Sequence, residues 1–63
     1  MIQFNVYYPG FIAGKTYHAK YAAHPFYGHL AIKAVDEDGH TRYLEIELLE
    51  DGYIVEVDGD EDY

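Results

Sequence analysis

The side chains of this protein that could do chemistry are mainly carboxylates, and they are distributed unevenly. All twelve acidic residues lie within positions 36–63, whereas three of the four cationic residues lie within positions 1–35. The first stretch therefore carries a formal charge of +3 and the second −11, which gives the net charge of −8. Such asymmetry is typical of a protein that recognises a basic partner, or a protein surface that normally holds nucleic acid.

The residue types of the sequence give little indication of catalysis or metal binding. The sequence has no serine and no cysteine, which removes the commonest nucleophiles and every thiolate ligand, and a chain of 63 residues rarely encloses an enzyme-sized pocket. Asp58, Asp60 and Asp62 match the first three ligand positions of a calcium loop, but Tyr63 stands where that loop requires glycine. The histidines follow no metal-binding spacing: they are His18, His24, His29 and His40. We therefore expect no enzyme activity, no catalytic residue, no metal site and no cofactor.

β-Strands must position the carboxylates, because apolar and polar residues alternate along most of the chain. The two-residue period of a half-buried strand recurs in segments 2–8, 30–35, 43–48 and 53–58. Pro9-Gly10 ends the first segment as a turn. Asp-Gly, the dipeptide that most strongly marks a hairpin, joins the last three segments at 38–39 and at 51–52. We therefore expect these three segments to form a meander.

Residues 15–23 are compatible with two structures. Tyr17, Ala19 and Tyr21 alternate with polar residues as in a strand, whereas the alanines and the Tyr17-to-Tyr21 spacing also suit a short helix. We favour the strand. The next residues, 24–28, are expected to form a loop, because the residue before Pro25 is disfavoured in helical geometry.

These elements predict an all-β fold: a small antiparallel meander, a strongly bent sheet or an SH3-like barrel of four to five strands. The alternative is an α+β fold with a short helix at about 15–23. Residues 1–58 are expected to form a single small β-rich domain, and residues 59–63 an acidic C-terminal tail that is too charged and too short to pack.

The two Asp-Gly turns fix the register of the predicted meander. A three-residue loop at 37–39 with a G1 bulge and a type I′ turn at 51–52 both place apolar residues on one face, with Gly39 and Gly52 at positive φ. The expected core pairs are Ile32 with Leu44, Leu30 with Ile46, Leu48 with Val55, and Ile46 with Val57. In this register Ile46 lies in the centre and should be fully buried.

The same register predicts a carboxylate array on the outer face, with Glu47 opposite Glu56 and Glu45 opposite Asp58. Like charges in such positions destabilise a sheet by about 0.2 to 1 kcal/mol per pair, and acids two residues apart are spaced by about 6.5 to 7 Å, much as successive phosphates are. A phosphate-like array for a cationic groove is one interpretation, and ordinary solubilising surface charge is the other. The predicted partner-binding residues are Glu45, Glu47, Glu56, Asp58, Asp36, Asp38 and Tyr43.

In size, charge and composition the chain is similar to the small acidic proteins with which phages block host nucleic-acid enzymes, such as uracil-glycosylase inhibitors, anti-restriction proteins and anti-CRISPRs. That resemblance implies a viral inhibitor that acts as a nucleic-acid mimic in the cytoplasm of the host cell. The alternative is a small adaptor or assembly subunit that binds a protein partner, or a second copy of itself as a homodimer, through a Tyr-rich face.

Other classes of partner have weaker support. The three lysines of the first half, interleaved with aromatic residues, resemble the composition of single-strand binders, but a net charge of −8 disfavours direct contact with nucleic acid. The N-terminal residues 1–6 have neither a basic region nor a long apolar run. We therefore expect a soluble intracellular protein with no membrane partner and no direct nucleic-acid partner.

Overall fold

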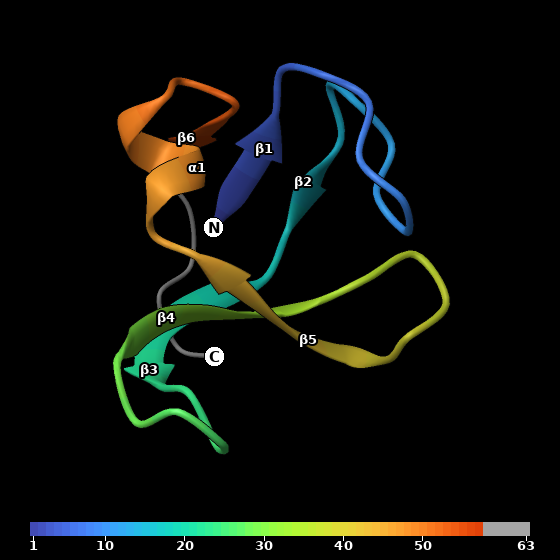
Figure 1. The fold of residues 1–63 in the computed structure, drawn as a ribbon. Helices are drawn as coiled ribbons and strands as arrows, with labels where there is room; N and C mark the ends of the chain where they lie inside the picture. The colour runs from blue at the N-terminus through green and yellow to red at the C-terminus, as the bar shows by residue number, and fades with distance from the viewer. Residues whose placement is uncertain (58–63) are drawn as a thin grey trace.

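Two small antiparallel sheets make up the fold in the computed structural model, which describes residues 1–57 (Figure 1). Strands β2, β1 and β6 form one sheet, in that order, and β3, β4 and β5 form the other. The elements are β1 (Ile2–Phe4), β2 (Thr16–Tyr17), β3 (Ala19–Ala23), β4 (Leu30–Val35), β5 (Thr41–Glu45), α1 (Glu47–Glu50) and β6 (Ile54–Glu56). The predicted all-β, antiparallel fold class is therefore confirmed.

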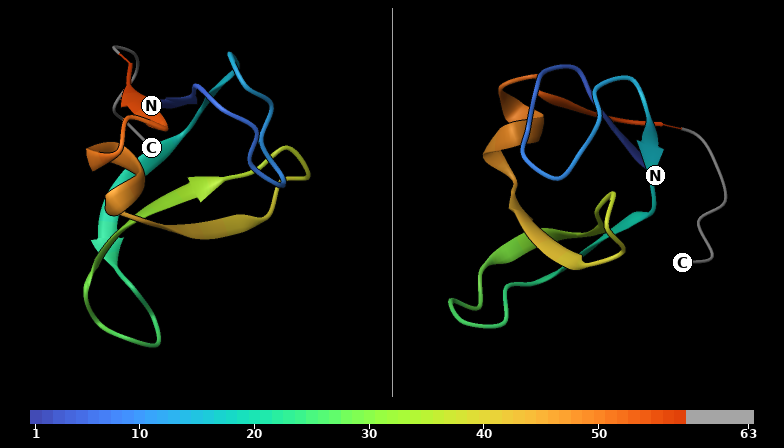
Figure 2. Two further views of the ribbon diagram at one scale, coloured as in Figure 1. Left: turned by 45° about the horizontal axis from the view of Figure 1, so that its top comes forward. Right: turned by 90° about the vertical axis from the view of Figure 1, so that its right-hand side faces the viewer.

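Within the predicted segment 15–23, residues 16–17 and 19–23 are strands, as favoured from the sequence. Only His18 separates β2 from β3, so a single bent segment passes from one sheet to the other (Figure 2). The Val35 N–H donates to the His18 carbonyl at 3.2 Å, which keeps the bend attached to β4. Corners of this kind let one strand serve two inclined sheets. The alternative helix at these positions is wrong.

The core lies between the sheets and is rich in aromatic rings. Its largest fully buried side chains are those of Phe4, Leu44 and Ile54. The Phe4 ring stacks on Phe11 with a centroid distance of 4.6 Å and on Tyr8 at 5.0 Å. Each such pair contributes about 0.5 to 1.5 kcal/mol beyond the area it buries.

The first strand is shorter than predicted, because the chain leaves the sheet after Phe4. The predicted turn at Pro9-Gly10 is present, with the Phe11 N–H donating to the Tyr8 carbonyl at 3.0 Å. The Gly14 N–H donates to the Phe4 carbonyl at 2.9 Å, so residues 5–15 form a loop that returns to β1. This loop brings the rings of Tyr8 and Phe11 onto Phe4, which a straight strand over 2–8 would not do.

The first predicted hairpin turn is confirmed. The Asp36 N–H donates to the His40 carbonyl at 2.9 Å and the Gly39 N–H donates to the Asp36 carbonyl at 3.0 Å. Gly39 has a φ of 86°, as a three-residue loop with a G1 bulge requires. Ile32 therefore pairs with Leu44, as expected.

The second predicted hairpin is wrong, because residues 47–50 form helix α1. Gly52 has the predicted positive φ, 79°, but for another reason: it ends the helix. The Gly52 N–H donates to the Leu49 carbonyl at 3.1 Å and the Tyr53 N–H to the Leu48 carbonyl at 2.9 Å. These two bonds form a Schellman motif, in which glycine is the favoured residue.

Strand β6 consequently pairs with β1 instead of β5. Phe4 lies opposite Ile54, and Ile2 lies opposite Glu56. The predicted pairs of Leu30 with Ile46, Leu48 with Val55, and Ile46 with Val57 do not form, since β5 ends at Glu45. Ile46 occupies the N-cap position of α1 and is only partly buried, so its predicted full burial is also wrong.

Candidate functional site

The predicted four-carboxylate array on one sheet face does not form in this fold. Glu45, Glu47 and Glu56 are all exposed, but they belong to three different elements, β5, α1 and β6. Glu47 and Glu56 are not opposed, because Glu56 pairs with Ile2 of β1. Asp58, the fourth member, lies outside the described residues, and so does its predicted pairing with Glu45.

A different concentration of charge replaces it, which we call the acidic ridge: Glu45, Glu47, Glu50 and Asp51. All four residues are exposed, and residues 45–51 include no lysine or arginine. Asp51 stands at the C-cap of α1, where the helix dipole disfavours negative charge. Helix α1 contacts both β5 and β6, so Glu56 lies on an element next to the ridge.

Two of the cations are held at the other end of β5, around the β4–β5 turn. Arg42 Nη1 donates to Asp36 Oδ2 at 3.1 Å, and Lys15 Nζ donates to both carboxylate oxygens of Glu37, at 2.7 and 2.8 Å. The Glu37 N–H also donates to the Gly10 carbonyl at 2.8 Å. These contacts fasten the loop of residues 5–15 to the turn.

The Asp36 side chain is buried and accepts hydrogen bonds from other residues of this turn. Its Oδ1 accepts the N–H groups of Asp38 and His40, both at 2.9 Å, and its side chain is only 4% exposed. Burial raises the pKa of Asp36, but hydrogen bonds from His40, Arg42 and Asp38 outweigh it and lower the pKa below its usual value. The predicted partner-binding residue Asp36 therefore holds the turn together and does not face solvent, whereas Asp38 is exposed.

The same turn brings together ligand atoms of Asp36, Asp38 and His40, all within 4.8 Å of one another. Both oxygens of the Asp36 carboxylate already accept hydrogen bonds, and the Arg42 guanidinium lies where a cation would bind. The cluster is thus explained by the turn itself.

Glu37 was not singled out by the sequence, yet its side chain accepts three hydrogen bonds from other described residues, as many as that of Asp36. Besides the two bonds from Lys15, it accepts the Tyr17 hydroxyl at 2.7 Å. The bond from Lys15, and then the bond from Tyr17, lower the pKa of Glu37. Burial, followed by the bond to Glu37, raises the pKa of Tyr17. A turn acid is thereby bonded to residues 15 and 17, which lie about twenty positions away in the sequence.

Aromatic rings gather at the β3–β4 connection, residues 24–29, which we call the aromatic loop. The His24 ring lies 4.8 Å from that of Tyr27, 5.2 Å from His29 and 5.7 Å from Tyr43, measured between centroids. Its Nδ1 accepts the N–H groups of Phe26 and Tyr27 at 3.1 and 3.3 Å. Phe26 is 86% exposed and Tyr27 76% exposed. The predicted partner-binding residue Tyr43 is half-buried beside this loop.

One acid of the ridge touches the aromatic loop. His29 Nε2 lies 3.3 Å from Glu45 Oε1, a pair that becomes a salt bridge when the histidine is protonated. The end of the ridge at β5 is therefore next to the rings of the loop. Figure 1 shows the loop at the bottom of the molecule and α1 near the top, with β5 between them.

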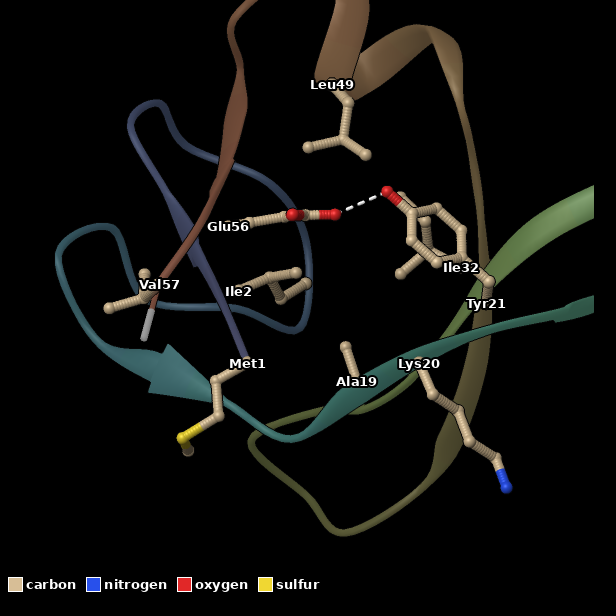
Figure 3. Close-up of a pocket in the computed structure, with 9 residues that line it drawn as sticks. All are labelled: Met1, Ile2, Ala19, Lys20, Tyr21, Ile32, Leu49, Glu56 and Val57. Atoms are coloured by element: carbon tan, nitrogen blue, oxygen red, sulfur yellow. Dashed lines mark hydrogen bonds between the residues drawn. The ribbon is translucent and has the colours of Figure 1, made fainter. Parts of the chain in front are cut away.

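A pocket of about 430 Å³ opens between the two sheets (Figure 3). Its walls come from β1, β3, β4, α1 and β6, and apolar side chains such as Ile2, Ile32 and Leu49 line it. The Tyr21 hydroxyl donates to Glu56 Oε2 across its mouth. That bond, followed by burial, raises the pKa of Tyr21. No sequence pattern predicted this pocket, because its residues are distant along the chain.

In comparisons with known proteins, no family model, no curated protein and no solved structure matches the chain significantly. Within residues 1–57, no helix has the length and apolar character needed to cross a membrane. The function is therefore inferred from the geometry of the acidic ridge, the aromatic loop and the pocket.

Proposed function

We propose that this protein is a small acidic interaction module that occupies the basic, nucleic-acid-binding surface of a partner protein and excludes the nucleic acid from it. The observation that carries this proposal is the acidic ridge, four exposed carboxylates within seven consecutive positions, 45–51, without a lysine or arginine among them. Such a module is an inhibitor of the kind that phages use against host enzymes, and it needs no catalytic group of its own.

Electrostatics give the ridge two properties that a competitor needs. A concentration of one sign of charge steers an oppositely charged partner and raises the rate of association. It also rejects nucleic acid, because phosphates are repelled by carboxylates. The Asp51 carboxylate at the C-cap of α1 adds to this charge where it does not help the helix, which favours a role in binding over a role in stability.

A second candidate is an adaptor that binds its partner through the aromatic loop. The observation in its favour is the exposure of Phe26 and Tyr27, 86% and 76%, at the tip of a hairpin. Aromatic residues are enriched at protein interfaces, where each contributes a large contact area at small entropic cost. Binding of this kind depends on burial of apolar surface and changes little with salt.

Two matched variants separate these candidates. The ridge variant replaces Glu45, Glu47 and Glu50 with Gln and Asp51 with Asn, which removes charge and keeps shape. The loop variant replaces Phe26 and Tyr27 with Ser. Each variant and the wild-type protein are used to capture partners from cells of the native host at low and at high salt, and the captured protein is then purified.

The decisive measurement is competition with a labelled DNA or RNA duplex for the purified partner, followed by fluorescence anisotropy. We expect the wild-type protein to displace the duplex, the loop variant to do the same, and the ridge variant to fail. The affinity should fall steeply as salt rises, because exposed charges are screened beyond about 8 to 10 Å at physiological ionic strength. Full affinity of the ridge variant, or a partner that binds no nucleic acid, would contradict the proposal and favour the adaptor.

A further inference from the structure

We propose that the pocket between the two sheets takes the side chain of one lysine or arginine of the partner protein, with its apolar stem in the pocket and its charged head on the Glu56 carboxylate. This inference rests on the proposed function, because it requires a partner with a basic surface. It adds a defined anchor point to what would otherwise be a diffuse attraction between charges.

The pocket has the apolar interior that the stem of a long basic side chain needs. Ile2 and Ile32, which are 3% and 2% exposed, belong to the hydrophobic core and reach the pocket as well. Leu49 of α1 covers one side, as Figure 3 shows. At about 430 Å³ the pocket lies within the range of ligand pockets, roughly 300 to 1,000 Å³, so it has room for the whole stem of a lysine or arginine side chain.

The charge at the mouth has the sign that such a side chain requires. Glu56 and Tyr21 are both exposed, and Figure 3 shows the Glu56 carboxylate among the lining side chains, bonded to the Tyr21 hydroxyl. An ionised carboxylate has about four acceptor positions, and the hydroxyl uses one of them. The tyrosine thus orients the carboxylate and leaves it able to accept further N–H donors. Lysine and arginine combine an aliphatic stem with a cationic head, which is the complementary arrangement.

Lys20 lines the pocket but does not fill it. In Figure 3 its side chain extends from β3 away from the Glu56 carboxylate and from the other lining side chains. Glu56 is the acidic residue among those that line the pocket, and its carboxylate attracts the cationic head of a side chain that enters beside it.

The position of the pocket connects it to the acidic ridge. Leu49, which forms one wall, belongs to the same helical turn as Glu47 and Glu50. A basic surface attracted to this turn would bring its long side chains within reach of the mouth. Charge complementarity and continuity with the ridge therefore identify the occupant as a side chain of the protein partner rather than a free amine.

The test compares two probes that differ only by the terminal ammonium group, N-acetyl-lysine N-methylamide and N-acetyl-norleucine N-methylamide. Each is titrated into the ¹⁵N-labelled full chain, and binding is followed by amide chemical shifts. We expect the lysine probe to shift the amides of Ile2, Ile32, Leu49 and Glu56, with an affinity about fivefold higher than that of norleucine, as a partly exposed ion pair allows. Butylamine, a free amine without the peptide groups, should bind more weakly than the lysine probe.

Two variants show whether Glu56 is responsible. Glu56→Gln should reduce lysine binding to the norleucine level, and the fold should be kept, because the glutamine oxygen can still accept the Tyr21 hydroxyl. Asp38→Asn removes the same unit of charge from an exposed turn outside the pocket and should leave lysine binding unchanged. Equal affinity for the two probes, an unchanged affinity in Glu56→Gln, or shifts that avoid the pocket would each overturn the inference. Butylamine binding as tight as that of the lysine probe would instead identify a small-molecule amine site.

Failure of this inference can be told apart from failure of the proposed function. A partner whose binding requires the acidic ridge, together with no shift in the pocket, overturns the pocket inference alone. Shifts in the pocket together with full affinity of the ridge variant for the partner overturn the proposed function and its phosphate-mimic mechanism. The two results come from independent measurements, one on the isolated chain and one on the complex.

Discussion

Removing the side chain of Leu44 should destabilise the protein far more than removing that of Ile46, although the two residues are equivalent in the sequence pattern. Leu44 is 2% exposed and belongs to the core, whereas Ile46 is partly buried at the start of α1. Truncating a fully buried leucine costs about 2 to 5 kcal/mol, because the cavity closes only partly. At Ile46 part of the side chain already faces solvent, so we expect a loss of about 1 kcal/mol.

The size of the chain makes this difference easy to measure. At about 0.05 to 0.15 kcal/mol per residue, a chain of 63 residues has a total free energy of unfolding of about 3 to 9 kcal/mol. A domain of this size loses about 4 to 8 °C in melting temperature per kcal/mol. A loss of about 3 kcal/mol in Leu44→Ala therefore lowers the melting temperature by roughly 12 to 24 °C, and Ile46→Ala lowers it by roughly 4 to 8 °C.

Thermal unfolding and urea unfolding, both followed by circular dichroism, provide the measurement. The urea m-value should be the same for both variants, because the surface exposed on unfolding hardly changes. Equal losses at the two positions, or a larger loss at Ile46, would refute the packing described above. That result would mean that β5 continues through Ile46 into the core, as the regular alternation in the sequence suggests.

Other variants test the turns and the buried acid. Gly10→Ala should cost up to about 1 kcal/mol more than Gly28→Ala in thermal unfolding, because both glycines have positive φ but only at Gly10 would the new Cβ push the Arg42 guanidinium off the Asp36 carboxylate; equal losses would contradict the close approach. Gly52→Val should lower stability by roughly 1 kcal/mol or more, because a β-branched residue is strained at the positive φ that ends α1, and an unchanged melting temperature would disprove that geometry. Because the pKa of Asp36 is lower in the folded protein than its usual 3.8, its contribution to stability should be present in full above pH 3.8 and be lost as pH falls below that value. Melting temperatures of wild type and Asp36→Asn measured from pH 7 to pH 2 should therefore converge at low pH, and parallel curves would count against this assignment.

Features set by a few neighbouring residues were predictable from the sequence. The β4–β5 hairpin is fixed by its own turn, because Gly39 supplies the positive φ that the G1 bulge needs. This turn places Ile32 opposite Leu44. The strand character of residues 15–23 followed from the two-residue period, although that period gave no sign that the strand bends at His18.

Residues 46–52 could not be assigned from their pattern. Leu44, Ile46 and Leu48 alternate as in a strand, but leucine and glutamate are also good helix formers, and Gly52 fits a type I′ turn and a helix C-terminus equally well. The choice depends on β1, whose edge accepts β6 and buries Ile54. The structure of residues 46–52 therefore depends on a strand about fifty positions away. Local propensities carry no information about such a strand pairing.

For the candidate site, the positions of the acidic residues along the chain indicated the kind of chemistry, and long-range packing selected the groups that take part. The net charge of −8 follows from composition alone, so an acidic surface was expected whatever the fold. The formation of α1 and the pairing of β6 with β1 left Glu47 and Glu56 unpaired with each other and placed Glu47 and Glu50 on one helical turn between Glu45 and Asp51, while packing buried Asp36 in the β4–β5 turn. The pocket exists only because two sheets and α1 meet there, and Glu56 and Tyr21 stand across its mouth as a result of contacts between residues far apart in the chain.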